Sequence, residues 1–220
     1  MEKPSIVQQL ATQLLSKDTP HPKRLVIIAQ LNRHFLEAPT FEKCAADVEQ
    51  LPQGVLPLVF SLVSSGEPHV YLALNLLHFA CFAPSHRTNL LRLKAAPFLA
   101  GLLRAGGEHE LCRAALSLLV TVGQGEEGRQ HIGNSNGLAK LAAKYLRHDS
   151  AELRDLAIQL LRALLWSANG RKQACSSAAS LEDAAQEAKK KSTGNQQREL
   201  DSILRELAIY EKRLKTAAYQ

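Results

Sequence analysis

The sequence contains one literal match to a nucleotide-binding motif, the run GQGEEG at residues 123–128. The pattern G-x-G-x-x-G holds a pyrophosphate when it follows a strand and opens a helix whose N-terminus meets the anion. Here the preceding run from Leu111 to Val122 has helical spacing, and Glu126 and Glu127 would repel a phosphate. We therefore interpret the segment as a loop between helices and expect no nucleotide cofactor.

The histidines and cysteines show no recognised metal or nucleophile motif. No two of the eight histidines have H-E-x-x-H or H-x₃₋₅-H spacing, and His78 and Cys81, one helical turn apart, are typical of packed residues. The sequence also has no G-x-S-x-G elbow and no P-loop. It predicts a protein that is not an enzyme, with no catalytic, cofactor-binding or metal-ligating residues. The cysteines are Cys44, Cys81, Cys112 and Cys175.

The composition is that of a globular protein. Of 220 residues, 45% are hydrophobic, 22% charged and 5% aromatic, which excludes a disordered or collagen-like chain. Four cysteines are too few for a disulfide-built scaffold, and no signal peptide is recognised. The longest apolar run, residues 55–63, is broken by Pro57 and Ser61 and is too short to span a bilayer. We expect an intracellular, cytoplasmic protein with no membrane insertion.

The sequence predicts that most of the chain folds into helices. All nine prolines lie at or before Pro97, and the remaining runs are rich in Ala, Leu, Arg, Lys, Glu and Gln, with apolar residues at i, i+3, i+4 and i+7. One such stripe predicts an amphipathic helix from Ile6 to Leu15, and Asp149 with Glu152 has the spacing of a capping box. The pattern favours an all-α chain. Breaks are expected at Gly106-Gly107, Gly123 to Gly128, Gly133 to Gly137 and Asn169-Gly170.

A period of 42 residues organises the middle of the chain. Four columns recur at this shift in three successive units, and helical repeats of about 40–47 residues are typical of α-solenoids. A small residue in one column is expected to let neighbouring helices approach closely. The columns are Ala73/Ala115/Ala157, Leu76/Leu118/Leu160, Leu77/Leu119/Leu161 and Arg87/Arg129/Arg171.

The stretch from Glu127 to Leu165 resembles an armadillo repeat. A short first helix, a glycine-containing break, a second helix, a tight turn and a long third helix with A-x-x-L-L follow in that order. The resemblance implies a right-handed armadillo-like α-solenoid of three to four repeats with terminal capping helices. The expected parts are an N-terminal capping helix in residues 1–24, a degenerate repeat in 25–66, repeats in 67–108, 109–150 and 151–190, and a C-terminal amphipathic helix in 195–218.

The resemblance also implies where a partner would bind, because the third helices of armadillo proteins line the concave groove. The stripe opposite the apolar columns is mostly polar, which suits binding of an extended peptide or a partner helix. An ordinary solvated helix face explains the same stripe equally well. The nine positions are Tyr71, Asn75, His78, Arg113, Ser117, Val120, Asp155, Gln159 and Arg162.

A nuclear-import function is disfavoured within this family. Import receptors hold a basic peptide with a ladder of Trp and Asn on successive third helices. Here Leu74, Leu116 and Ile158 replace the Trp, and His78, Val120 and Arg162 replace the Asn. The ladder is absent, and a basic chain would not steer a basic peptide toward itself.

The C-terminal helix is a second candidate partner surface. After a helix-prone run and a linker-like segment, apolar residues occupy a and d positions of nearly three heptads. A cap that folds back on the last repeat accounts for the same stripe. The candidate contacts are Leu200, Ile203, Leu207, Tyr210 and Leu214.

The positive charge lies mainly in the second half of the chain. Residues 1–110 carry 10 Lys/Arg and 9 Asp/Glu, whereas residues 111–220 carry 17 and 12, including the triplet Lys189-Lys190-Lys191.

The main hypothesis is a non-catalytic scaffold or adaptor that binds another protein. The alternatives are a structural subunit of a larger cytoskeletal or ciliary assembly that contacts acidic tubulin and, more distantly, an RNA-associated scaffold. A solvated basic face explains the charge as well, and the lack of a dense basic stripe disfavours nucleic acid.

Overall fold

The runs with a helical apolar stripe are helices in the structure, a computed structural model that describes residues 4–64 and 69–217, without the side chains of residues 214, 215 and 217. These described residues form fourteen helices and no strand, so the all-α prediction is confirmed. The expected boundary between repeats at residues 66 and 67 lies outside the described residues. The chain divides into two compact units, residues 1–95 (unit 1) and 96–220 (unit 2).

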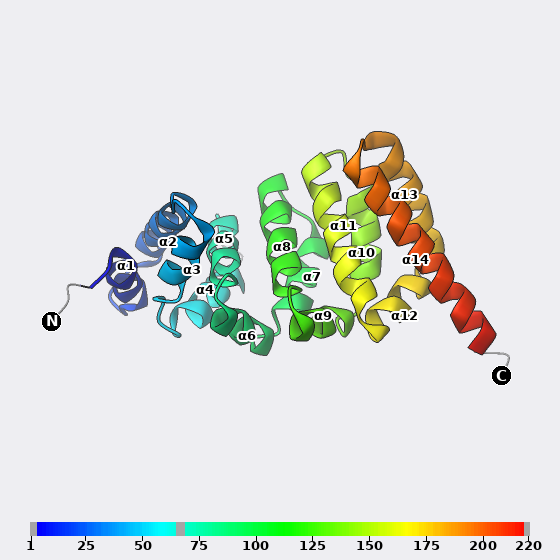
Figure 1. The fold of residues 1–220 in the computed structure, drawn as a ribbon. Helices are drawn as coiled ribbons and strands as arrows, with labels where there is room; N and C mark the ends of the chain where they lie inside the picture. The colour runs from blue at the N-terminus through cyan, green and yellow to red at the C-terminus, as the bar shows by residue number, and fades with distance from the viewer. Residues whose placement is uncertain (1–3, 65–68, 218–220) are drawn as a thin grey trace. The chain divides into compact units, whose positions relative to one another are not determined.

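The described residues of unit 1 form six helices and the first residue of a seventh; the six are drawn in Figure 1. The first helix has the bounds that the sequence predicts, and its N-terminus carries a reciprocal capping box between Ser5 and Gln8. Its apolar stripe of Val7, Ala11 and Leu14 is buried. The helices are α1 (Ile6–Leu15), α2 (His21–Leu36), α3 (Phe41–Val48), α4 (Val55–Ser64), α5 (Val70–Ala80) and α6 (Pro84–Arg92).

A buried carboxylate joins α2 to α3 in unit 1. Asp47 is 5% exposed and accepts hydrogen bonds from Lys43 Nζ at 2.8 Å and from His34 Nε2 at 3.1 Å. Burial alone would raise the pKa of Asp47, but the hydrogen bonds from Lys43 and His34 outweigh it and lower the pKa below its ordinary value. The ionised carboxylate is therefore the form that the fold favours.

This gives a pH-dependent prediction for Asp47→Asn. Because the folded pKa is depressed, the stabilisation is present above the unfolded pKa of about 3.9 and is lost as the pH falls through the folded value. Asp47→Asn should lower the free energy of unfolding by about 1–2 kcal/mol at pH 7. The difference from wild type should shrink below about pH 4. Urea unfolding at both pH values measures it, and an equal deficit at pH 3 would contradict the assignment.

After its first two helices, unit 2 is built from two consecutive sets of a short, a medium and a long helix. Within it, α9 packs on α12, α10 on α13 and α11 on both α8 and α14, so that like helices of neighbouring sets lie side by side (Figure 1). The helices are α7 (Ala95–Ala105, whose first residue belongs to unit 1), α8 (His109–Val122), α9 (Glu126–Gly133), α10 (Leu138–Leu146), α11 (Ala151–Trp166), α12 (Ala168–Ser176), α13 (Ala178–Lys191) and α14 (Asn195–Ala217).

The 42-residue period marks equivalent buried positions on the long helices α5, α8 and α11. All nine Ala and Leu side chains of the three apolar columns are at most 1% exposed. The same shift applied once more reaches α14 at Glu199, Ser202 and Ile203, of which Ile203 is the only buried member. The helix α14 therefore holds the position of a long third helix, with polar residues where the earlier columns are apolar.

Two glycines one period apart lie where the short helices meet the preceding long helix. A Cβ on Gly128 would overlap the carbonyl oxygen of Val122, and a Cβ on Gly170 would overlap the carbonyl oxygen of Leu164. The two carbonyls are also 42 residues apart. Gly128 and Gly170 therefore form a further column of the 42-residue repeat, in addition to the apolar and arginine columns.

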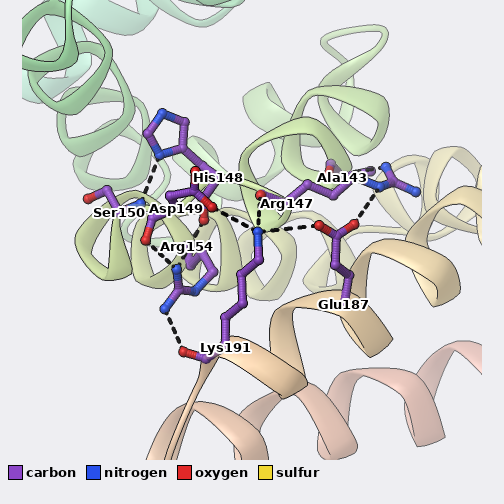
Figure 2. Close-up of polar contacts among 8 residues, drawn as sticks. All are labelled: Ala143, Arg147, His148, Asp149, Ser150, Arg154, Glu187 and Lys191. Carbon is purple, nitrogen blue, oxygen red and sulfur yellow. Dashed lines mark hydrogen bonds and ion pairs between the residues drawn. The ribbon is translucent and has the colours of Figure 1, made fainter.

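The C-terminal end of α13 is attached to the turn between α10 and α11 by ion pairs (Figure 2). Lys191 Nζ lies 2.9 Å from Asp149 Oδ1 and 3.4 Å from Glu187 Oε1, and Lys189 Nζ lies 2.6 Å from Asp201 on α14. The hydrogen bond from Lys191 lowers the pKa of Asp149. Two lysines of the basic triplet are therefore already paired within unit 2.

A buried arginine lies beneath this cluster (Figure 2). Arg154 is 4% exposed, and its guanidinium donates to the carbonyl oxygens of His148 at 3.0 Å, Asp149 at 2.7 Å and Lys191 at 2.9 Å. These carbonyls belong to the turn before α11 and to the end of α13. One side chain of α11 thus satisfies backbone acceptors from two segments.

Three local predictions need correction. The cap of α11 is Ser150, whose Oγ accepts from the Leu153 amide, while Asp149 pairs with Lys191 instead. The loop predicted at residues 123–128 is limited to 123–125, because α9 begins at Glu126. The break predicted at Asn169-Gly170 lies inside α12, which Ser167 caps by accepting from the Gly170 amide at 3.0 Å.

No helix in the described ranges 4–64 and 69–217 combines the length and apolarity needed to cross a bilayer.

Candidate partner-binding groove

The long helices of unit 2 border a hollow of about 570 Å³. Three of the predicted concave-face residues line it, Val120 from α8 and Gln159 and Arg162 from α11. We call this hollow the groove. Its other lining residues are Gly123, Gln124, Arg129, Ala163, Trp166, Ser202, Ile203 and Glu206, contributed by the α8–α9 turn, α9, α11 and α14.

An arginine stacks on the tryptophan in the groove. The Arg129 guanidinium carbon lies 4.9 Å from the centre of the Trp166 ring, within the range of a cation–π contact. Trp166 is 43% exposed although it is the chain's one tryptophan and a strongly apolar residue. A second, smaller hollow of about 300 Å³ also reaches Trp166, so the indole forms a wall between two depressions.

The charged residues around the groove are partly paired. Arg162 Nη2 lies 3.6 Å from Glu199 Oε1 on α14, with both side chains substantially exposed. Such an exposed pair contributes at most about 1 kcal/mol and separates readily. Farther toward the start of the helices, Arg113 bridges Glu110 at 2.9 Å and Glu152 at 3.8 Å, joining α8 to α11.

The remaining predicted concave-face residues lie elsewhere on the long helices. In unit 2, Ser117 is half-buried on α8, and Asp155 accepts a hydrogen bond of 2.7 Å from Gln159 Nε2 on α11. In unit 1, α5 carries Tyr71, Asn75 and His78, all half-buried. His78 also packs on Phe82, with 5.3 Å between ring centres.

The C-terminal helix uses most of its predicted contact residues for packing inside unit 2. Leu200, Ile203 and Leu207 are at most 3% exposed, because α14 packs on α11, α12 and α13 (Figure 1). Tyr210 is half-buried under the Arg171 guanidinium, 4.6 Å from its ring centre, and the side chain of Leu214 lies outside the described residues. The burial favours the alternative in which this helix covers the last helices of the repeat fold.

The sequence interpretation missed four residues that shape the groove: Trp166, Arg129, Ser202 and Glu206. Arg129 stands out in the sequence as a member of the arginine column, and Trp166 stands out as the sole tryptophan. Neither feature indicates that the side chain is exposed in the folded protein. Ser202 and Glu206 join the groove because α14 takes a third-helix position, which the apolar stripe of this helix does not reveal.

The residues that resembled chemical motifs serve packing. Burial of Cys81 raises the pKa of its thiol to about 12, which makes it a poor thiolate ligand beside His78. The element before the glycine run is the helix α8, and Gly125, at φ 80°, is the N-cap of α9, whose first turn carries two glutamates. Over the described residues, no three His, Cys, Asp or Glu side chains come together as a metal site.

No protein-family model matches the chain, and no curated protein matches it. Solved structures do. A designed armadillo repeat protein in complex with the peptide (KR)4 is 15% identical, with 92% of this chain and 100% of that chain covered and a TM-score of 0.58.

Two further engineered structures are similar at the level of the fold. Another designed armadillo repeat protein is 15% identical, with 91% of this chain and 99% of that chain covered and a TM-score of 0.66. An engineered protein is 14% identical, with coverage of 93% and 99% and a TM-score of 0.67. The chain therefore has an armadillo-like repeat fold, the α-solenoid that the sequence predicts.

Proposed function

We propose that this chain is a non-catalytic scaffold that binds a peptide or helix of a partner protein in the groove. The observation that carries the proposal is a hollow of about 570 Å³ on three long helices with a half-exposed tryptophan in its wall. Its volume lies within the range of about 300–1,000 Å³ typical of ligand sites. Exposed aromatic and arginine side chains are the residue types enriched in protein interfaces.

The fold supports the same proposal. One solved structure similar to this chain is a designed armadillo repeat protein in complex with a peptide. Stacked helical repeats present their long helices as an extended binding surface. The predicted residues Val120, Gln159 and Arg162 belong to that surface in unit 2.

The other hypotheses receive less support. The basic triplet is part of the charge that an acidic tubulin surface would meet, but Lys189 and Lys191 are paired with carboxylates of unit 2. An intracellular, reducing location agrees with four free cysteines, three of them buried.

Selection of random peptides of about twelve residues from a display library tests the proposal. The exposed Ser202 lines the groove, so Ser202→Phe should fill it without disturbing the core. Ser180→Phe, an exposed position on α13 outside the groove lining, is the matched control. Peptides selected on wild type should bind Ser180→Phe equally and lose binding to Ser202→Phe.

Two results would contradict the proposal. One is the absence of any enriched peptide, and the other is undiminished binding of the enriched peptides to Ser202→Phe. Circular dichroism of both variants establishes that they are folded, so a loss of binding is assigned to the filled groove.

A further inference from the structure

The donors of Arg129 are open toward the groove, whereas those of its counterpart one period later are occupied. Arg171 stacks on Tyr210 and donates through Nη1 to the carbonyl oxygens of Leu165 and Trp166, both at 3.0 Å. The Arg129 guanidinium lies over the Trp166 ring but has no hydrogen-bond or ion-pair partner among residues 4–64 and 69–217. Of the two members of the arginine column in unit 2, Arg171 therefore bonds to the backbone of the fold through its guanidinium, whereas the guanidinium of Arg129 does not.

A stacked guanidinium is prepared to bind a carboxylate. The cation–π contact holds the guanidinium beside the ring, and the N–H donors along its edge remain available to an acceptor. That edge matches the two oxygens of a carboxylate in a bidentate pair. Because Arg129 is half-buried, the pair would be less screened by solvent than one on an open surface.

The rest of the groove adds a second cation and an apolar floor. Arg162 lies on the same wall of α11 as Trp166, and its exposed pair with Glu199 at 3.6 Å can open. Val120, Ala163 and Ile203 supply apolar surface between the charged groups. Among the described residues that line the groove, Glu206 on α14 is the one acidic side chain, so the two arginines leave this lining net positive.

On the basis of the proposed function, we infer that the groove selects a partner segment in which a carboxylate side chain lies beside an apolar one. The carboxylate pairs with Arg129 and Arg162, and the apolar side chain packs on Trp166, Val120 and Ile203. The long-range field agrees, since residues 111–220 carry 17 Lys/Arg against 12 Asp/Glu. This preference is opposite in charge to the basic peptide held by the similar designed protein.

Three synthetic peptides of about eight residues test the inference on the full chain. One alternates glutamate with leucine, one glutamine with leucine, and one lysine with leucine. Trp166, the sole tryptophan, reports binding by its fluorescence. The glutamate peptide should bind most tightly, by about tenfold or more over the glutamine peptide, and its affinity should fall as sodium chloride is raised.

Variants locate the interaction. Arg129→Gln should weaken the glutamate peptide about tenfold and leave the glutamine peptide unchanged. Arg198→Gln, the same charge change at an exposed position of α14 outside the groove lining, should have no effect on either peptide. Glu206→Gln should increase the affinity for the glutamate peptide, because it removes a like charge.

The outcomes separate this inference from the proposed function. If the lysine or glutamine peptide binds as tightly as the glutamate peptide, or Arg129→Gln has no effect, the acidic preference is overturned. Groove-dependent peptides from the display experiment would still uphold the scaffold function in that case. If none of the three peptides binds, the inference is overturned as well. Displacement of the glutamate peptide by a lower concentration of single-stranded DNA would assign the groove to nucleic acid and overturn it too.

Discussion

Replacing Gly170 with alanine should strongly destabilise unit 2, although glycine to alanine inside a helix is ordinarily favourable. The added Cβ would overlap the Leu164 carbonyl oxygen and approach Ser167 Oγ to 2.8 Å. The Leu164 carbonyl belongs to α11 and Ser167 caps α12, so neither group can move aside easily. To accommodate the added methyl group, α12 must therefore move away from α11. We expect a loss of about 1–3 kcal/mol in the free energy of unfolding, the usual cost of overpacking a close contact.

The chain offers a matched control in Gly101. This glycine is exposed on α7, and a Cβ there has no neighbour within 4 Å. Gly101→Ala should therefore stabilise the protein by about 0.5–1 kcal/mol through the better helix propensity of alanine. Chemical denaturation of both variants measures the difference. A Gly170→Ala protein as stable as Gly101→Ala would show that α12 does not pack this closely on α11.

Loss of the buried guanidinium should be the second large effect. Arg154→Ala removes three hydrogen bonds, at 2.7 to 3.0 Å, and leaves the carbonyl oxygens of His148, Asp149 and Lys191 without this donor. Buried acceptors left unpaired cost more than exposed ones, so we expect a destabilisation of about 2–4 kcal/mol. Arg154→Lys should recover only part of it, because a lysine cannot reproduce the planar fork.

Arg147 provides the comparison for Arg154. It lies in the same cluster, but its ion pair with Glu187 at 3.5 Å is formed by side chains 38% and 44% exposed. Arg147→Ala should cost less than about 1 kcal/mol. Thermal unfolding followed by circular dichroism ranks the variants, and equal losses for the two arginines would contradict the distinction between buried and exposed donors.

The 42-residue periodicity was enough to predict an α-solenoid. Each long helix buries side chains against its neighbours, so apolar residues recur at the same positions in successive repeats. Ala115, Leu118 and Leu119 recur one period before and after, and all nine column members are buried. The error in the cap of α11 arises because two neighbouring side chains suit one role. Asp149 and Ser150 are both good helix caps, and in the structure Ser150 caps α11 while Asp149 pairs with Lys191, 42 residues after it in the sequence.

The groove could be predicted only in part. Val120, Gln159 and Arg162 follow from the helix face opposite the apolar columns. Trp166 does not, because tryptophan is largely buried on average, whereas this side chain at the last residue of α11 is 43% exposed. The contribution of α14 to the groove lining could not be predicted either. The stripe of Leu200, Ile203 and Leu207 predicts an amphipathic helix, but it does not identify the helices on which that helix packs.

The two faces of α14 imply a thermodynamic coupling. One face attaches the helix through Leu200 and Leu207, and the other forms a wall of the groove through Ser202 and Glu206. Helices held from one side open locally at lower free energy than helices enclosed by neighbours. A molecule in the groove would contact α11 and α14 at once, so its binding free energy would add to the attachment of α14. Occupancy would then slow amide hydrogen exchange and proteolysis along residues 195–217 while leaving exchange in unit 1 unaltered.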